Sequence, residues 1–178
     1  MIDKVLNNVT NVFINNDIMY GIGGSYMLDR CYFKTKVNDI DIFIAKKDLA
    51  KTFNVMKLYD KLSSNAVVNI KSLYHQRYLI NDIQIDLMAD MYICHHQQWF
   101  LYSLHDQEQL QNINGKDYMY IEDWYYIYWL LNRKDKVKLI REYWLKSRDI
   151  DHSRIANLIK IGPELFYQQN KVLFDKML

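Results

Sequence analysis

Three aspartates are the side chains best placed for chemistry. Asp39 and Asp41 flank a single isoleucine in the stretch NDIDIFI, and Asp86 lies in the later stretch IQIDLM. Residues two apart on a strand project from the same face, so the first two carboxylates would lie side by side. Adjacent carboxylates repel one another unless a cation lies between them, and Mg²⁺ prefers oxygen ligands of this kind. The three aspartates are therefore candidate metal ligands.

A glycine turn precedes these acids. Gly23 and Gly24, followed by Ser25, stand between an apolar segment and an expected helix. Glycine lets the backbone approach a ligand closely, and the free amides at a helix start favour phosphate, to which the serine adds a hydroxyl donor. Each feature alone is more typical of an ordinary turn or an exposed strand face. Their order along the chain favours a site for a metal-bound nucleoside triphosphate.

The spacing of apolar residues predicts the elements that would position this site. Strands are expected in IMYGIGG and NDIDIFIA, a hairpin with its turn at Asn81-Asp82, and a second hairpin closed by Asn114-Gly115. Helices are expected at 2–15, 25–33, 47–62, 122–132, 134–147 and 151–160, with a last helix beginning at Pro163. Residues 91–117 otherwise show no clear pattern.

The order of these elements predicts an α+β fold, with a small mixed β-sheet, flanking helices and a helical C-terminal part. We expect residues 1–117 to form the catalytic core and residues 118–178 the helical part. At 178 residues the chain can bury a core without disulfides, and its two cysteines form no metal-binding pattern. With no membrane-spanning run and no signal peptide, the expected location is the cytoplasm.

Charge is unevenly distributed along the chain. From Arg133 onward there are eleven Lys or Arg against six Asp or Glu, whereas the preceding residues carry twelve against fifteen. An acidic front and a basic tail suit a metal site that faces a phosphate-bearing ligand. Solvated helix faces would give the same balance of charges, so charge alone does not distinguish these two interpretations.

The stretches GIGGSYML…NDIDIFI and IQIDLM resemble the polymerase-β-type nucleotidyltransferase superfamily. Size and layout are most similar to small bacterial members, such as lincosamide-type antibiotic nucleotidyltransferases and the nucleotidyltransferases of toxin–antitoxin pairs. The resemblance covers residues 17–145 and includes a helix that ends in an Arg133-Lys134-Asp135 corner. Many relatives carry an arginine and a threonine shortly before the first acid. Here Thr35 and Val37 take those places, with lysines beside them.

The resemblance implies transfer of a nucleoside monophosphate from a nucleoside triphosphate such as ATP to an acceptor hydroxyl, with release of pyrophosphate. It implies two Mg²⁺ ions, for which Mn²⁺ could substitute, held by the three aspartates. Asp86 would also act as general base. The residues implied in nucleotide binding are Gly23, Gly24, Ser25, Lys36, Arg133 and Lys134.

The sequence leaves the acceptor open between a small molecule such as an antibiotic, a tRNA and a protein. It also leaves open the oligomeric state, a homodimer included. The alternative class is a non-catalytic protein that binds nucleotide or a partner, such as a toxin–antitoxin component. The presence of all three acids favours an enzyme.

Two other groups of residues are weaker candidates. His75, Cys94 and the adjacent His95 and His96 contain zinc-binding side chains, but adjacent histidines diverge in direction. A cluster of aromatic residues at 124–129 could stack on bases, although helical spacing makes core packing the favoured interpretation.

Overall fold

In the computed structural model, which describes residues 1–63 and 69–175, the chain forms two compact units. The first comprises Met1–Tyr92 and Leu101–Tyr120, and the second comprises Ile93–Phe100 and Ile121–Leu178. We retain the division between residues 117 and 118 as a prediction. The last three residues of the predicted helical part lie outside the described residues.

A mixed sheet is the main β-structure. Over the described part of the chain it has eight strands in the order β3-β4-β5-β2-β1-β8-β7, with β6 paired to β5. The strands are β1 Tyr20–Ile22, β2 Ile40–Ile44, β3 Asp60–Leu62, β4 Ile70–Ile80, β5 Ile83–His95, β6 Gln98–Tyr102, β7 Leu110–Ile113 and β8 Lys116–Met119. Parallel pairs (β2 with β5, β1 with β8) occur beside antiparallel ones, which confirms the predicted α+β class.

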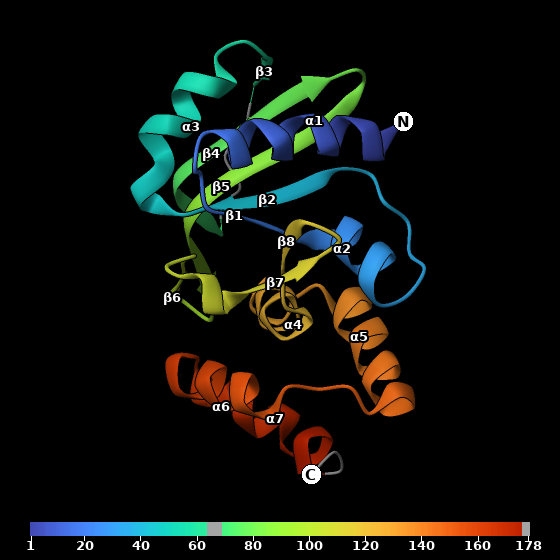
Figure 1. Cartoon of the computed structure of the whole chain (residues 1–178). Helices are drawn as coiled ribbons and strands as arrows, with labels where there is room; N and C mark the ends of the chain where they lie inside the picture. Colours follow the sequence, from blue (N-terminus) through green and yellow to red (C-terminus); the bar gives the residue numbers. More distant parts are fainter. Residues whose placement is uncertain (64–68, 176–178) are drawn as a thin grey trace. The chain divides into compact units, whose positions relative to one another are not determined.

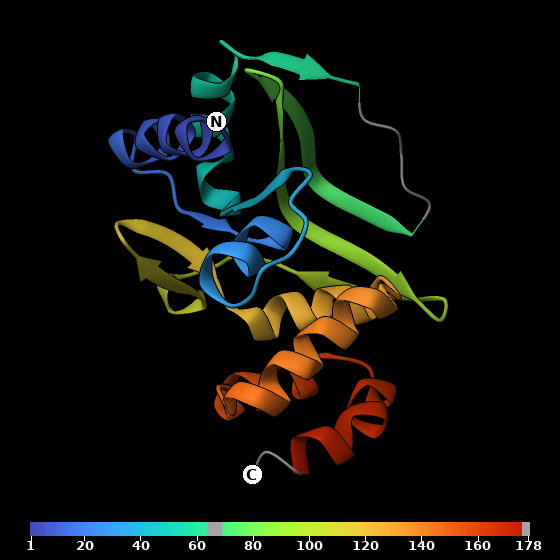
Figure 2. The ribbon, with the colours of Figure 1, turned by 90° about the vertical axis from the view of Figure 1, so that its right-hand side faces the viewer.

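The helices follow the predicted apolar spacing for most of the chain. They are α1 Ile2–Asn15, α2 Gly24–Cys31, α3 Leu49–Met56, α4 Ile121–Leu130, α5 Lys134–Ser147, α6 His152–Ile161 and α7 Glu164–Asp175. Short 3₁₀ turns stand at Lys46–Asp48 and Gln107–Gln109. Figures 1 and 2 show α1 and α3 on the same face of the β4–β5 hairpin. Among the described residues, no helix is both long and apolar enough to cross a bilayer.

The helix predicted at 47–62 was too long. Helix α3 ends at Met56, and Asp60 begins a strand that pairs antiparallel with β4. Thr52 and Met56 are buried on the inner face of α3, whereas Leu58 is 83% exposed and so cannot serve as a core position of a longer helix. Backbone pairing with β4 therefore sets the structure of the last residues of this segment.

Both predicted hairpins are confirmed. Asn81 and Asp82 have positive φ angles of 49° and 61°, and Asn114 and Gly115 have φ angles of 52° and 77°. Positive φ at both central residues is the geometry of the two-residue turn that matches the twist of antiparallel strands. Strand β5 continues to His95, well beyond the predicted hairpin, and β6 was not predicted.

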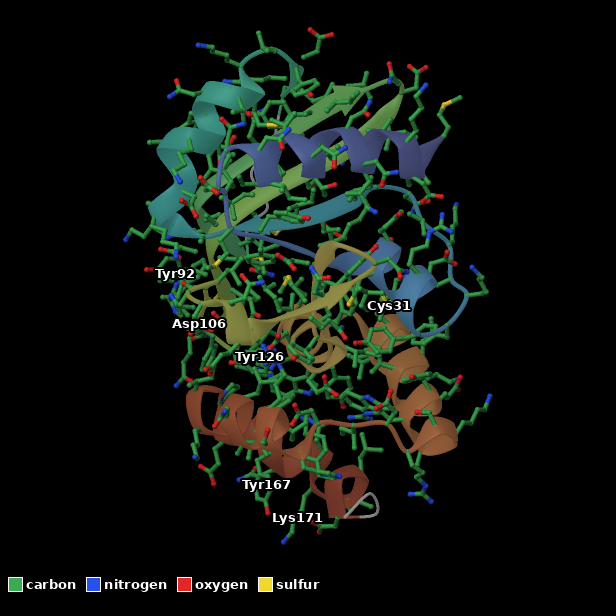
Figure 3. The ribbon with its side chains drawn as sticks, viewed as in Figure 1. Cys31, Tyr92, Asp106, Tyr126, Tyr167 and Lys171 are labelled. Carbon is green, nitrogen blue, oxygen red and sulfur yellow. The ribbon has the colours of Figure 1, made fainter. Side chains whose placement is uncertain are left out.

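Helix α4 carries the aromatic cluster of the second unit. Every one of its residues is buried. The ring of Tyr125 lies 4.7 Å from that of Trp144, and the ring of Trp129 lies 5.1 Å from that of Phe166. Tyr126, labelled in Figure 3, also packs on Phe166. The aromatic cluster therefore belongs to the core, as helical spacing predicted.

Candidate active site

Asp41 and Asp86 occupy paired positions on neighbouring parallel strands. In the register of β2 and β5, Ile40 faces Ile85 and Asp41 faces Asp86. Neighbouring strands lie about 4.8 Å apart, and residues at paired positions project from the same face of a sheet. The alternation of apolar and acidic residues on both strands thus brings two carboxylates from distant parts of the sequence side by side.

Asp39 lies one residue before β2, not within the strand as predicted. Asp39 and Asp41 are both half-buried, whereas Asp86 is only 8% exposed. Among the described residues, no three His, Cys, Asp or Glu side chains are gathered into a ready metal site. The donor chemistry itself fits Mg²⁺, because aspartate oxygens are the ligands this ion takes together with phosphate oxygens. Asp39, Asp41 and Asp86 are the residues that would hold it.

The glycine turn packs directly against Asp41. The Gly23 N–H donates a hydrogen bond to the Asp41 carbonyl oxygen at 2.9 Å. Gly24 has a φ of +62°, and a Cβ at this position would lie 1.9 Å from Asp41 Oδ2. Both the backbone conformation and the space therefore require glycine at position 24. The turn and the first strand acid form one local unit.

Helix α2, which follows the turn, is fixed to α1. Ser25 in its first turn is buried. The Tyr26 hydroxyl donates to Asp3 Oδ1 at 2.6 Å, and Arg30 pairs with the same carboxylate at 2.9 Å. These contacts hold the amide-bearing start of the helix in place beside Asp41.

The loop that leads to Asp39 is fixed by Asp29. This carboxylate accepts the Thr35 N–H at 3.2 Å and lies 3.4 Å from Lys34 Nζ. The Thr35 N–H, together with Lys34, lowers the pKa of Asp29 below its usual value. Lys36 is exposed on the same loop, so its predicted contact with phosphate stays a prediction.

Three side chains that the sequence did not assign to the active site surround Asp86. Gln84 Nε2 donates to Asp86 Oδ1 at 2.8 Å. His75 Nε2 and Arg77 Nε, both from β4, each lie 3.6 Å from Asp86 Oδ2. The sequence does indicate the contact between Arg77 and Asp86, because counting back from a two-residue turn at 81–82 places position 77 opposite position 86.

Arg133 and Lys134 belong to the second unit. Arg133 is the N-cap of α5 and Lys134 is its first residue. Their predicted role in nucleotide binding therefore stays a prediction.

Cys31 and two of the histidines have identifiable surroundings. Cys31, labelled in Figure 3, ends α2, and burial raises the pKa of its thiol to about 11. A thiol that stays protonated is a poor nucleophile. His95 Nδ1 lies 2.9 Å from the Leu130 carbonyl oxygen, and burial lowers the pKa of its imidazole. His75, the third histidine considered for zinc, lies instead against Asp86.

Solved structures share this architecture. TM1012 from Thermotoga maritima, provisionally described as a nucleotidyltransferase, matches with a TM-score of 0.59 and 19% identity, over 80% of this chain and 91% of its own. The antibiotic-resistance factor ANT(2″)-Ia in solution matches with a TM-score of 0.51 and 12% identity, over 97% of this chain and 89% of its own. Its crystal structure with adenylyl-2″-tobramycin matches with a TM-score of 0.50 and 13% identity, over 98% and 95%.

This chain has the nucleotidyltransferase fold. The resemblance predicted from the glycine turn and the aspartates is thus confirmed at the level of the fold. No family model matches the sequence, and no curated protein matches it either. Since one fold can host many activities, function must be argued from the site.

Proposed function

We propose that this chain is a magnesium-dependent nucleotidyltransferase, which moves a nucleoside monophosphate from a nucleoside triphosphate to an acceptor hydroxyl and releases pyrophosphate. The observation that supports it most is the pairing of Asp41 with Asp86 across two parallel strands, with the glycine turn packed against Asp41. Structural neighbours include an antibiotic-resistance factor solved with an adenylylated antibiotic, so the fold supports this chemistry elsewhere.

In this proposal Asp86 is the general base. The acceptor hydroxyl gives its proton to the Asp86 carboxylate while its oxygen forms a bond to the α-phosphorus. The bond from the α-phosphorus to the bridging oxygen breaks, and pyrophosphate leaves with the electron pair. Mg²⁺ bound by Asp39, Asp41 and Asp86 would supply positive charge that stabilises the phosphate oxygens.

The other site residues bind and orient the triphosphate. The Gly24 backbone and the Ser25 hydroxyl lie at the start of α2, where helix amides favour anionic oxygens. The Gly23 N–H is donated to the Asp41 carbonyl oxygen, so Gly23 contributes through the turn that it forms. Lys36, Arg133 and Lys134 are proposed to contact the phosphates as cations, as the sequence resemblance implies. The carboxylates would then hold the positively charged magnesium ion, and the turn would hold the negatively charged phosphates of the same nucleotide.

The test is the substitution Asp41→Asn. We expect it to lower nucleotidyl transfer at least a hundredfold, because the amide removes a negative ligand oxygen, while the far-UV circular dichroism spectrum stays unchanged. Asp60→Asn is the matched control, since Asp60 is an exposed acid on β3 of the same sheet. Pyrophosphate release would be measured with each nucleoside triphosphate, Mg²⁺ and RNA, tobramycin, lincomycin or lysate as acceptor.

Full transfer by purified Asp41→Asn protein would contradict the proposed site. Nucleotide binding without pyrophosphate release from any acceptor would instead support the alternative, a non-catalytic nucleotide-binding or partner-binding protein of the toxin–antitoxin kind.

A further inference from the structure

The surroundings of Asp86 differ in charge on its two sides. Strand β5 lies between β2 and β4 in the sheet. On the β2 side stands the acid Asp41, followed by the glycine turn of β1. On the β4 side stand two basic side chains, His75 and Arg77, each 3.6 Å from Asp86 Oδ2.

The proposed reaction assigns these two sides to different substrates. The triphosphate would lie at the glycine turn and Asp41. In an in-line displacement the attacking and leaving oxygens lie on opposite sides of the phosphorus. An acceptor that gives its proton to Asp86 therefore approaches from the side away from the turn, which is the side of His75 and Arg77.

These two basic side chains are accessible to a ligand. The side chains of His75 and Arg77 are each 27% exposed, while that of Asp86 is 11% exposed. Arg77 Nε itself is buried and donates no hydrogen bond within the described part of the chain. Its 3.6 Å separation from Asp86 Oδ2 is too long for a hydrogen bond, and an unsatisfied buried donor is costly. Because Nε itself is closed to solvent, a ligand anion would meet the exposed remainder of the Arg77 side chain.

We propose that the acceptor carries a phosphate group close to its reacting hydroxyl, and that Arg77, assisted by His75, binds this phosphate. The inference rests on the proposed function, since it names the acceptor class for the same site. A guanidinium suits phosphate because its planar donors match the oxygens. An aminoglycoside would instead bring its ammonium groups into contact with Arg77, and like charges in contact repel one another.

The phosphate group of the acceptor can belong to a nucleic-acid end or to a free sugar phosphate, and one acceptor of each kind distinguishes the two. Purified protein, Mg²⁺ and labelled nucleoside triphosphate would be incubated with a short RNA that has a free 3′ hydroxyl, with ribose 5-phosphate, with tobramycin and with lincomycin. We expect label on the RNA or on the sugar phosphate, and none on tobramycin. Transfer to the RNA alone would identify a nucleic-acid end as the source, and transfer to ribose 5-phosphate a free sugar phosphate.

Arg77→Gln then tests the residue assignment. We expect it to raise the KM for the phosphate-bearing acceptor at least tenfold, with a smaller change in kcat, because Arg77 also lies beside Asp86, and with the KM for the triphosphate changed less than twofold. Lys61→Gln is the matched control, because it removes an exposed cation from β3, which pairs with β4, and should leave all three constants unchanged. Isothermal titration calorimetry of the same acceptor should show the matching loss of affinity.

Several results would overturn the inference. Label on tobramycin with none on either phosphate-bearing acceptor would do so. So would an Arg77→Gln enzyme that loses kcat or triphosphate affinity with an unchanged acceptor KM, because Arg77 would then only position Asp86. If pyrophosphate is released but phosphate-bearing acceptors neither bind nor take label, this inference fails alone. If no acceptor supports pyrophosphate release, the proposed function is wrong, and the inference that rests on it is wrong as well.

Discussion

Gly24 shows how closely a single residue can link the two parts of the site. Its φ of +62° and the 1.9 Å that would separate a Cβ from Asp41 Oδ2 exclude any side chain there. The sequence predicts that these glycines give a phosphate access to the backbone. The structure adds a second role, because the absence of a side chain also lets the Asp41 carboxylate lie against the turn.

Glu122 is a buried acid outside the candidate site. It is 2% exposed on α4, and its Oε1 accepts the Asp151 N–H at 3.0 Å. Burial raises the pKa of its carboxyl from the ordinary 4.5 to about 7, and the nearby acids Asp123 and Asp151 add to the rise. The folded protein therefore holds a proton on Glu122 that the unfolded chain releases near pH 4.5.

This raised pKa predicts a stability that falls with pH. Because the folded state binds the proton more tightly, the contribution is complete below about pH 4.5 and is lost as pH rises through about 7. Its full size is on the order of 3 kcal/mol. Glu122→Gln keeps an oxygen that accepts the Asp151 N–H but cannot ionise, so we expect its stability to fall about 1–3 kcal/mol less than that of the wild type between pH 5 and pH 8.

Urea unfolding followed by tryptophan fluorescence suits this measurement, because all four tryptophans lie in the second unit, which contains Glu122. Glu142→Gln on α5 is the control, since it removes an exposed carboxyl and should leave the wild-type pH dependence unchanged. Equal slopes for Glu122→Gln and the wild type would contradict a raised pKa at this position.

The acids and glycines of the candidate site could be selected from sequence because their types and alternation are local patterns. The neighbours of Asp86 were missed for a different reason. His75 and Arg77 lie against Asp86 across the β4–β5 hairpin, a contact that depends on strand pairing several residues back from the turn. Roles for Arg133 and Lys134 depend on the placement of the second unit, which no local pattern specifies.

At the scale of elements, the two predicted hairpin turns form a natural comparison. Both place two consecutive residues at positive φ, but one uses Asn81-Asp82 and the other Asn114-Gly115. A non-glycine residue pays a steric cost in the left-handed region, which glycine avoids. The first turn is therefore the weaker of two similar structures.

Exchange of the second turn residue tests this difference. We expect Asp82→Gly to raise the free energy of unfolding by about 0.5 kcal/mol and Gly115→Asp to lower it by a similar amount. The double variant should lie near the wild type, since the two turns are separate. Urea unfolding followed by far-UV circular dichroism would measure all three variants. A destabilised Asp82→Gly protein would show that the Asp82 side chain makes a contribution that outweighs the backbone cost.

Element prediction succeeded where the apolar pattern was long and failed where strands were short or mainly exposed. Helix α1 and the two hairpins follow directly from spacing and turn residues. Strand β3 has only three residues and no buried side chain, so its sequence carries no period-two pattern. Strand β6 carries mainly exposed side chains, and its pairing with β5 decides its conformation.

At the scale of the whole molecule, the second unit contains a segment inserted between two parts of the first. Residues 93–100 belong with the helices that begin at Ile121, although twenty residues of the first unit separate them in sequence. His95 is the clearest link, because its Nδ1 lies 2.9 Å from the Leu130 carbonyl oxygen and its ring lies 4.3 Å from that of Trp129. A linear division of the chain cannot separate the units without cutting such contacts.

A chain that ends at Tyr120 tests this organisation. It would keep residues 93–100 but lose their contacts with α4, including those of His95, and it would expose the end of β5 to solvent. We therefore expect it to associate on size-exclusion chromatography and to melt at least 10 °C below the full chain, since exposed apolar strand ends promote association. A control chain ending at Asp175 keeps every described helix and should melt within a few degrees of the full chain. A monomeric chain 1–120 that melts cooperatively at the full-chain temperature would show that the first unit is stable without the helices, and that residues 93–100 need no partner from α4.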